Sequence, residues 1–393
     1  MRIAHVITRM IVGGAQENTL LNCLDLLHDY NDEVLLVTGP ALGPEGDLLS
    51  EGRAGELPIA LLPRLRRAIH PRDWAAYRDV KTTLKSFQPD VVHTHSAKGG
   101  LLGRAAASSL NVPAIVHSVH GAPFHPFQPA SAREFFRHCE AWAGRRCHRL
   151  ISVADAMTDL MVDAKVAPRD KFTTIYSGME VEPFLQAEKR RSETRERFGL
   201  GDEHVVIGKI ARLFHLKGHE DLIKAAVDVV RRVPNVRFLL VGDGVLRAEL
   251  RAKIEDLSLE QHFLFAGLVP PSEVPDLIGA MDLLVHTSYR EGLARALPQA
   301  LIAGRPVVSY DVDGAREVTI TGETGVLVPP RDTAALAEAL IVLALDGRLR
   351  EQYGERGQEL FTDQFRHQTM TRRIRELYLD VLDSQSRRSS HEN

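Results

Sequence analysis

Short runs of apolar residues alternate with longer amphipathic segments along most of the chain. Runs that are apolar throughout predict strands buried on both faces, and a period near 3.6 residues predicts helices between them. The predicted strands are 3–7, 33–38, 91–95, 114–119, 150–153, 172–175, 205–211, 236–241, 263–266, 283–287 and 306–310. The clearest predicted helices are 15–27, 101–110, 221–232, 294–303 and 333–345, the fourth of them closed by Gly304 as its C-terminal cap.

This alternation predicts an α/β fold with parallel sheets that helices cover on both faces. The pattern restarts after the charged segment 186–203, which predicts two doubly wound, Rossmann-like domains with a linker near 178–184. Ligands of such sheets bind beyond the carboxyl ends of the strands, so we expect them in a central cleft that both domains face. The expected parts are an N-terminal domain over 1–183, a C-terminal domain over 184–364, a helix over 365–383 for which packing back on the N-terminal domain is one option, and a disordered tail over 384–393.

Composition excludes several classes of protein. The 393 residues suit two domains of roughly 100–200 residues each, and the net charge of −3 does not indicate nucleic-acid binding. Three cysteines are too few for a disulfide framework and fit a reducing cytoplasm. No apolar run approaches the ~20 residues that span a bilayer, and polar residues interrupt the first run, so it predicts a buried strand rather than a signal peptide. We therefore expect a cytoplasmic protein.

Glycines and histidines follow the strands of the N-terminal half. Gly13 and Gly14 open a helix after the first strand, where bare backbone can approach an anion, although a tight turn also explains them. They lack the GxGxxG spacing of dinucleotide-binding folds. His93 and His95 share one face of their strand and could ligate a metal ion together. No carboxylate or cysteine cluster lies nearby in the sequence, so a polar strand end is the favoured interpretation and no metal site is predicted.

His120, just before Gly121, is the best-placed candidate of the N-terminal half, and a hydrogen-bonded structural histidine is the alternative. In the C-terminal half, Arg212 and Lys217 lie on one predicted loop and could clamp a diphosphate, whereas a solvated basic loop is the alternative. Gly242 marks a further turn between strand and helix. The tripeptide 311–313 has the D-x-D form of a metal-ligand pair, but a turn at a strand end explains it better.

Taken together, these segments resemble family 4 of the glycosyltransferases, which has the GT-B fold. Each segment is weak alone, but their order, spacing and placement after strands make the set specific, and it spans nearly the whole chain. The matching segments are VGGAQ (12–16), DVVHTHSAKGGLLGRAAA (90–107), VHSVHGAPF (116–124), ARLFHLKGHEDLI (211–223), VGDGVLRAEL (241–250), REGLARALPQALIAGRPVV (290–308) and TGETGVLVPPRD (321–332).

The resemblance implies that a sugar passes from a nucleotide-sugar donor to a glycan or lipid-linked acceptor, in surface polysaccharide or glycolipid biosynthesis. It also implies retention of anomeric configuration and no need for a metal or other cofactor. Catalytic roles would fall on Arg212 and Lys217 at the diphosphate, Glu291 at the transferred sugar, and His120 beside the sugar and acceptor. The implied donor-binding residues are Gly13, Gly14, Gly242, Gly292, Leu293, Ala294, Arg295 and Gln299.

Gln299 is a departure from the family, which has a second Glu there for the ribose hydroxyls. An amide can still accept and donate one hydrogen bond each, and eight helical residues from Glu291 to Gln299 would span ~12 Å, enough to reach sugar and ribose. The departure leaves a catalytically weak nucleotide-sugar-binding subunit as one alternative, and a sugar-nucleotide epimerase on the same fold is another. The sequence does not identify the donor, the acceptor, the linkage or the oligomeric state.

Two stretches, 63–81 and 132–150, combine arginines with large apolar residues. Such a surface can bind anionic lipid headgroups, although solvated helix faces with extended arginines are the favoured interpretation. The chain is therefore a candidate for peripheral contact with the inner face of a membrane.

Overall fold

The computed structural model describes residues 1–42, 46–49, 54–71 and 73–391. The chain forms two compact units: unit 1 is Met1–Met179 together with Phe365–Asn393, and unit 2 is Glu180–Gln364. The division falls before the boundary predicted at 183/184, because the short helix α6 (Glu182–Leu185) already packs against α10 (Val274–Ala280) of unit 2.

The strands of unit 1 form a parallel sheet in the order β3-β2-β1-β4-β5-β6-β7. The apolar pattern predicted all of them except β3, which has three residues and lies at the sheet edge, partly exposed. The strands are β1 (Arg2–Arg9), β2 (Glu33–Gly39), β3 (Ile59–Leu61), β4 (Val91–His95), β5 (Ala114–Val119), β6 (Arg149–Ser152) and β7 (Phe172–Thr174).

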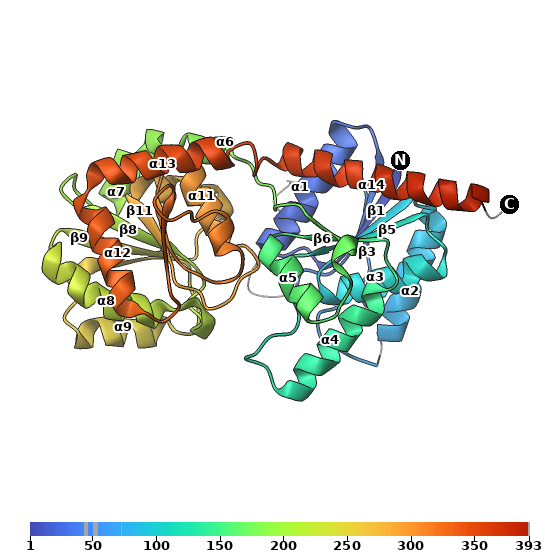
Figure 1. Ribbon diagram of the computed structural model, residues 1–393, viewed down its shortest axis with the longest axis horizontal. Coiled ribbons are helices and arrows are strands. Elements are labelled where there is room, and N and C mark those ends of the chain that lie inside the picture. Colours follow the sequence, from blue (N-terminus) through green and yellow to red (C-terminus); the bar gives the residue numbers. More distant parts are fainter. Residues whose placement is uncertain (43–45, 50–53, 72, 392–393) are drawn as a thin grey trace. The chain divides into compact units, whose positions relative to one another are not determined.

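Helices cover both faces of this sheet (Figure 1). Leu20 of α1 and Met370 of α14 belong to the apolar core on one face, and Val80 of α2 and Ala106 of α3 belong to the core on the other. The helices of unit 1 are α1 (Gly14–His28), α2 (Asp73–Phe87), α3 (Ala97–Ser109), α4 (Ala130–Gly144), α5 (Asp155–Asp163) and α14 (His367–His391).

The C-terminal helix α14 packs on α1 in unit 1, so the two ends of the chain share one core (Figure 1). Asp25 of α1 is buried and accepts a hydrogen bond from Thr371 Oγ1 at 2.7 Å, and His367 Nδ1 lies 2.8 Å from the same carboxylate. Polar contacts thus specify the docking that the apolar residues stabilise.

The prediction of a disordered tail after Asp383 is wrong as far as His391, because α14 continues to that residue. Extending an existing helix adds one hydrogen bond for each residue ordered, so polar residues can follow an anchored segment. Ser384 also donates to Asp380 O at 2.7 Å. Residues 392–393 lie outside the described part of the chain.

The strands of unit 2 form a second parallel sheet in the order β10-β9-β8-β11-β12-β13. This is the doubly wound strand order, and its direction reverses between β8 and β11. The sequence pattern missed β13, which has only four residues. The strands are β8 (Val205–Ile210), β9 (Val236–Val241), β10 (Phe263–Gly267), β11 (Leu283–His286), β12 (Val307–Tyr310) and β13 (Gly325–Val328). The prediction of an α/β fold with two Rossmann-like parallel sheets is confirmed.

The remaining helices of unit 2 are α7 (Arg191–Arg197), α8 (His219–Arg232), α9 (Arg247–Asp256), α11 (Ala296–Ile302), α12 (Thr333–Leu345) and α13 (Gly347–Phe361). Short 3₁₀ turns lie at 169–171 in unit 1 and at 187–190, 215–217, 260–262, 271–273 and 313–317 in unit 2. The charged segment 186–203 is not a break between domains, because its α7 packs on unit 2. Arg195 of α7 is buried and donates to Gly201 O at 2.6 Å and His204 O at 2.7 Å.

Within the part of the chain that the structure describes, no helix is both long enough and apolar enough to cross a bilayer.

Replacing Asp25 with Ala should loosen the docking of α14, because the buried Thr371 hydroxyl and the His367 ring would lose their acceptor. A buried polar group without a partner costs about 2 kcal/mol. Hydrogen exchange of the α14 amides should therefore show an opening free energy lower by about that amount. Asp29→Ala is the matched control at the exposed end of α1 and should change it by less than ~0.5 kcal/mol. Equal effects of the two variants would contradict the assignment.

Candidate functional site

Two of the predicted catalytic residues meet at the carboxyl end of the unit 2 sheet. Lys217 lies on the loop after β8, Glu291 lies on the loop after β11, and Lys217 Nζ donates a hydrogen bond to Glu291 Oε1. His286, the last residue of β11, places Nε2 3.4 Å from the same oxygen. Because the strand order reverses between β8 and β11, this is the position at which ligands bind to doubly wound sheets.

A glycine turn brings the two loops together. Gly218 has φ +62° and packs so closely that a Cβ there would lie 2.0 Å from Thr287 O. No other residue type fits both the left-handed backbone and this contact. The Thr287 hydroxyl donates to Gly218 O at 2.7 Å and holds the turn in place. Lys217, next to the turn, is thereby placed against the loop that carries Glu291.

Lys209, which the sequence analysis missed, lies beneath this ion pair. It is fully buried on β8, and its Nζ donates to Thr287 Oγ1 at 2.6 Å. Burial lowers the pKa of Lys209 to about 7, and the neighbouring Lys217 acts in the same direction. The signal in the sequence was a lysine inside an otherwise apolar strand. A strand with one face exposed to solvent would show the same pattern.

The carboxylate of Glu291 is held in its ionised form. Burial by itself raises the pKa of Glu291, but the contacts with His286 and Lys217 outweigh burial, and the net pKa lies well below the ordinary range. The Glu291 backbone N–H donates to Asp313 Oδ2 at 2.6 Å, which fixes the loop. Lys217 and Glu291 thus present opposite charges at one place.

The D-x-D tripeptide does not form a pair of metal ligands in this structure. Asp313 has φ +46° and anchors the Glu291 loop, whereas Asp311 forms an ion pair with Arg316 at 2.9 Å. The two carboxylates therefore bind different partners, and the interpretation as a turn at a strand end describes the tripeptide better.

The helix after Glu291 is shorter than predicted. It begins at Ala296 rather than Ala294, so Leu293, Ala294 and Arg295 precede it instead of forming its first turn. Gln299 lies one turn inside the helix, and the ~12 Å span from Glu291 to Gln299 no longer follows, because most of that segment is not helical. Gly292 O accepts a hydrogen bond from Gly314 N at 3.1 Å.

The C-terminal cap of this helix is confirmed. Gly304 has φ +70°, and the next residue, Arg305, donates through its backbone to Ala300 O at 2.8 Å.

The other predicted residues of unit 2 are placed less distinctively. The Arg212 side chain is exposed, and its guanidinium lies 4.9 Å from the centre of the Phe214 ring rather than in the Lys217–Glu291 pair. Gly242 has φ +131°, and a Cβ there would lie 2.2 Å from Ala211 O, so the fold alone requires this glycine.

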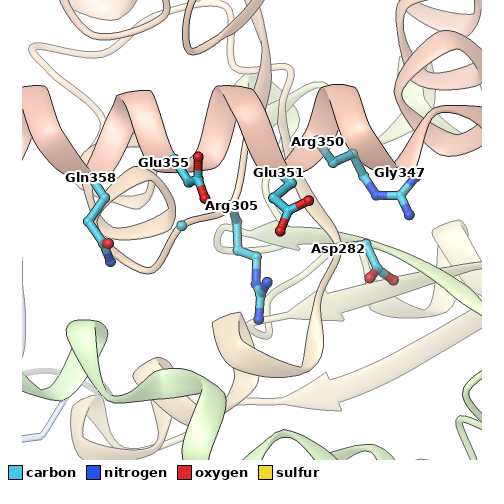
Figure 2. A pocket seen from close by; sticks show the side chains of 8 residues that line it. Asp282, Arg305, Gly347, Arg350, Glu351, Glu355 and Gln358 are labelled. Atoms are coloured by element: carbon cyan, nitrogen blue, oxygen red, sulfur yellow. The ribbon is translucent and has the colours of Figure 1, made fainter.

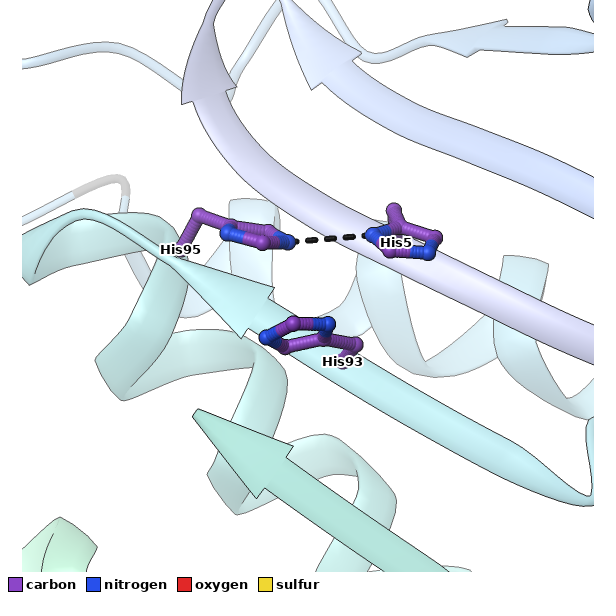
Figure 3. A group of neighbouring side chains, drawn as sticks. All are labelled: His5, His93 and His95. Atoms are coloured by element: carbon purple, nitrogen blue, oxygen red, sulfur yellow. Dashed lines mark hydrogen bonds between the residues drawn. The ribbon is translucent and has the colours of Figure 1, made fainter. Parts of the chain in front are cut away.

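In unit 1, the structure gathers histidines from two neighbouring strands (Figure 3). His5 of β1 and His93 and His95 of β4 are buried side by side, and His5 Nδ1 lies 3.0 Å from His95 Nε2. His95 Nδ1 lies 3.2 Å from Nε2 of His120, which follows β5. The sequence pattern pointed to His93, His95 and His120 but not to His5, because one histidine in an apolar strand carries no pattern of its own.

His5, His93 and His95 are the one group among the described residues whose ligand atoms lie close enough to hold a metal ion. Both nitrogens of His93 are already engaged, however: Nδ1 lies 2.5 Å from Tyr378 Oη and Nε2 lies 2.8 Å from Ser118 Oγ. The other two rings hydrogen-bond each other. Burial lowers the pKa of all three and that of His5 to about 3, so the rings are neutral. The arrangement fits a hydrogen-bonded set better than a metal centre.

Gly13 and Gly14 stand at the start of α1, where prediction placed them. The backbone of Gly13 is extended, with φ 175°, which any residue can adopt. A Cβ there would meet only the end of the flexible Gln16 side chain, at 2.8 Å. The fold alone therefore does not require glycine at this position.

A cavity of about 310 Å³ lies at the opposite edge of the unit 2 sheet (Figure 2). Asp282 and Arg305, which precede β11 and β12, line it. Three of its charged groups have structural partners: Asp282 pairs with Arg191 at 2.7 Å, Arg305 pairs with Glu188, and Arg350 donates to Leu343 O at 2.6 Å. This cavity at the amino ends of the strands is therefore a poor candidate for the functional site.

Comparison with known proteins decides the family. Residues 14–178 match the glycosyl transferase 4-like domain, and residues 190–360 match the domain of glycosyl transferases group 1. The chain belongs to the family-4 glycosyltransferases. The glycosyltransferase is 25% identical over 386 residues to the UDP-Gal:alpha-D-GlcNAc-diphosphoundecaprenol alpha-1,3-galactosyltransferase of Escherichia coli, covering 97% of both chains.

Two further similarities extend over most of the glycosyltransferase. It is 25% identical to the capsular polysaccharide biosynthesis glycosyltransferase CapM of Staphylococcus aureus, over 78% of this chain and 82% of CapM. The crystal structure of Anabaena HepE in complex with UDP superimposes with a TM-score of 0.82 at 22% identity, covering 97% of this chain and 100% of HepE. The structural similarity shows that the folds are the same.

Lys209→Met should stabilise the glycosyltransferase more at pH 6 than at pH 9. Above pH 7 the folded protein releases the Lys209 proton, whereas the unfolded chain keeps it up to about pH 10.4, so the stability of the wild type rises with pH. The advantage of the variant in free energy of unfolding should therefore shrink by about 2–3 kcal/mol between pH 6 and pH 9.

Urea unfolding at the two pH values measures this difference. Lys224→Met, at an exposed lysine of α8, is the control and should show no such change. A pH-independent effect of Lys209→Met would mean that Lys209 titrates at its ordinary value.

Proposed function

We propose that this glycosyltransferase moves a sugar from a nucleoside diphosphate sugar to a glycan or lipid-linked acceptor. The observation that carries the proposal is the Lys217–Glu291 pair at the point of strand reversal in unit 2. It puts a cation for a diphosphate beside a carboxylate for sugar hydroxyls. In support, the E. coli relative is named for UDP-Gal and a diphosphoundecaprenol-linked acceptor, and HepE was crystallised with UDP.

The pair can serve both parts of the donor at once. The Lys217 ammonium has three N–H donors, so its bond to Glu291 leaves others for phosphate oxygens. The ionised Glu291 carboxylate has several lone pairs and can accept from sugar hydroxyls while it holds Lys217. Arg212 is exposed on the same loop and would add a second cation once a diphosphate is present.

We propose that the transfer retains the anomeric configuration and needs no metal ion. Lys217 and Arg212 would neutralise the leaving diphosphate in place of a divalent cation. The bond from the anomeric carbon to the phosphate oxygen breaks, and the acceptor oxygen bonds to that carbon on the same face. The acceptor proton passes to the departing phosphate oxygen. His120 would line the sugar and the acceptor, and Gly13 would allow close approach of backbone to donor phosphate or acceptor.

A catalytically weak subunit that binds a nucleotide sugar is the second candidate function. Gln299 favours it, since a neutral amide replaces the charged partner of the ribose. Donor hydrolysis without acceptor separates the two functions: an enzyme releases nucleoside diphosphate, and a binding subunit does not.

Glu291→Gln should lower sugar transfer by at least ~100-fold, because it removes the charged acceptor that faces the sugar and leaves Lys217 without its partner. Transfer of a radiolabelled sugar from UDP-sugars, and then from GDP- and ADP-sugars, measures the effect. The wild-type rate should survive EDTA, and NMR should show the donor's anomeric configuration in the product. Asp311→Asn, at an acidic residue of the same sheet edge that pairs with Arg316, is the matched control and should stay near wild type. Full activity of Glu291→Gln would remove Glu291 from the site.

We also propose that α4 contacts an anionic membrane surface. Phe135 and Trp142 lie seven residues apart, on one face of the helix, and are 54% and 37% exposed. Arg146 lies over the Trp142 ring at 3.6 Å, and Arg145 is exposed beside it. Apolar side chains next to arginines suit the boundary between acyl chains and anionic headgroups. From the stretch 63–81, Trp74 of α2 is 66% exposed, and residue 72 lies outside the described residues.

Co-sedimentation with phosphatidylglycerol vesicles at low salt tests this contact. The double variant Phe135→Ser with Trp142→Ser should lose about 2 kcal/mol of binding free energy, which is the order expected from burying part of two aromatic side chains. Val245→Ser with Leu268→Ser, at exposed apolar residues of unit 2, is the control and should bind as the wild type does. Wild-type protein that stays in the supernatant would refute membrane contact.

A further inference from the structure

A chain of three histidine rings runs through unit 1 and ends at His120. His5 Nδ1 lies 3.0 Å from His95 Nε2, and His95 Nδ1 lies 3.2 Å from His120 Nε2. The planes of neighbouring rings are inclined by only 13° and 26°. His5 and His95 are buried, whereas His120 is only half-buried beyond the end of β5. The chain therefore leads from the sheet interior to the end of the sheet at which ligands bind.

The tautomers of these histidines are linked, because each neutral ring carries only one proton on its nitrogens. A neutral imidazole carries a single N–H, so it donates through one nitrogen and accepts through the other. His95 is neutral because burial lowers its pKa well below the ordinary value. It uses both nitrogens in the chain, so it must donate toward one neighbour and accept from the other. In a neutral His120 ring, the direction of the His5–His95 bond thus determines which nitrogen carries the proton.

The chain is also closed at its inner end. His5 Nε2 is buried and has no hydrogen-bond partner among the residues that the structure describes. Reversing the direction of the chain would require all the ring protons to change places together. Because no described partner at the inner end exchanges protons with His5, the tautomers of His5 and His95 are coupled to that of His120 through the two hydrogen bonds.

We propose that His95 and His5 are positioning residues that hold His120 in one tautomer and one orientation toward the sugar and its acceptor. The proposal rests on the role given to His120 under the proposed function. His93, the third buried histidine, takes no part in it: its ring lies 4.1 Å from that of His95, but its nitrogens bond Tyr378 and Ser118.

Two substitutions of His95 separate the two bonds. The side-chain amide of Asn places a polar atom where Nδ1 of His lies, and that of Gln places one where Nε2 lies. His95→Asn can keep the bond to His120, and His95→Gln can keep only the bond to His5. We expect His95→Gln to lower kcat roughly 10- to 100-fold, as small misplacements of reacting groups do, with the donor KM within about twofold. His95→Asn should recover most of that loss.

His93→Gln is the matched control, because His93 lies on the same strand and is equally buried, and the variant, like His95→Gln, loses the bond at Nδ1 (here to Tyr378) while it can keep the bond at Nε2 (here to Ser118). It should lower Tm at least as much as His95→Gln but leave kcat within about threefold of wild type. If both variants lose kcat equally and in proportion to their loss of stability, the histidine chain has only a structural role and the proposal is overturned.

A double-mutant cycle tests whether His95 acts through His120. Combining His95→Gln with His120→Gln should be no worse than His120→Gln alone, because nothing remains to be positioned. If the losses of kcat in the two single variants multiply in the double variant, the proposal is overturned. Should His120→Gln transfer sugar at the wild-type rate, the role of His120 fails and the proposal fails with it. A loss of transfer in Glu291→Gln but not in His120→Gln would leave the donor site standing.

Imidazole ¹⁵N NMR gives a readout without turnover. In the wild-type protein the His120 ring should show one protonated and one unprotonated nitrogen, as a single tautomer does. In His95→Gln the two shifts should move toward averaged values, and in His95→Asn they should stay near those of the wild type. Unchanged shifts in His95→Gln would overturn the proposal.

Discussion

The contact between the Gly218 turn and the end of β11 is the constraint on which the candidate donor site depends. Thr287 O lies so close to the backbone of Gly218 that no side chain fits at position 218. The Thr287 hydroxyl closes the contact by donating to Gly218 O and accepting from Lys209. Two loops from neighbouring strands are thus joined by backbone geometry, and Lys217 is carried against Glu291 as a consequence.

Charge is distributed unevenly around that contact. Lys209 lies in the sheet interior, where burial disfavours its charged form, and the pair of Lys217 and Glu291 lies above it, where opposite charges favour each other. A diphosphate arriving at this edge would add negative charge to a place that already holds two lysines and one carboxylate. A cavity also lies at the amino ends of the strands, but Asp282 and Arg350 in its lining hold other parts of unit 2 together.

Much of the architecture could be predicted, since short runs rich in apolar residues, such as 91–95 and 114–119, became strands with the predicted bounds. The parts that could not be predicted are short or depend on distant partners. β3 and β13 are too short to show a period, and α14 extends past Asp383 because its earlier turns are anchored on α1. The helix α11 begins two residues later than predicted, because Asp313 holds the loop before it in place of helical hydrogen bonds.

The sequence by itself determined the alternation of strands and helices, the two sheets and the segments that follow their strands, because hydrophobic periodicity and turn residues act locally. It therefore identified Lys217 and His120 as candidates, and the resemblance of the segments to family 4 added Glu291. Only the tertiary structure decided which of them have which neighbours: Lys209 beneath the ion pair, and His5 at the inner end of a histidine chain. Both lie on strands paired to others far along the chain, and a single polar residue in an apolar run reveals its role only when that pairing supplies its partner.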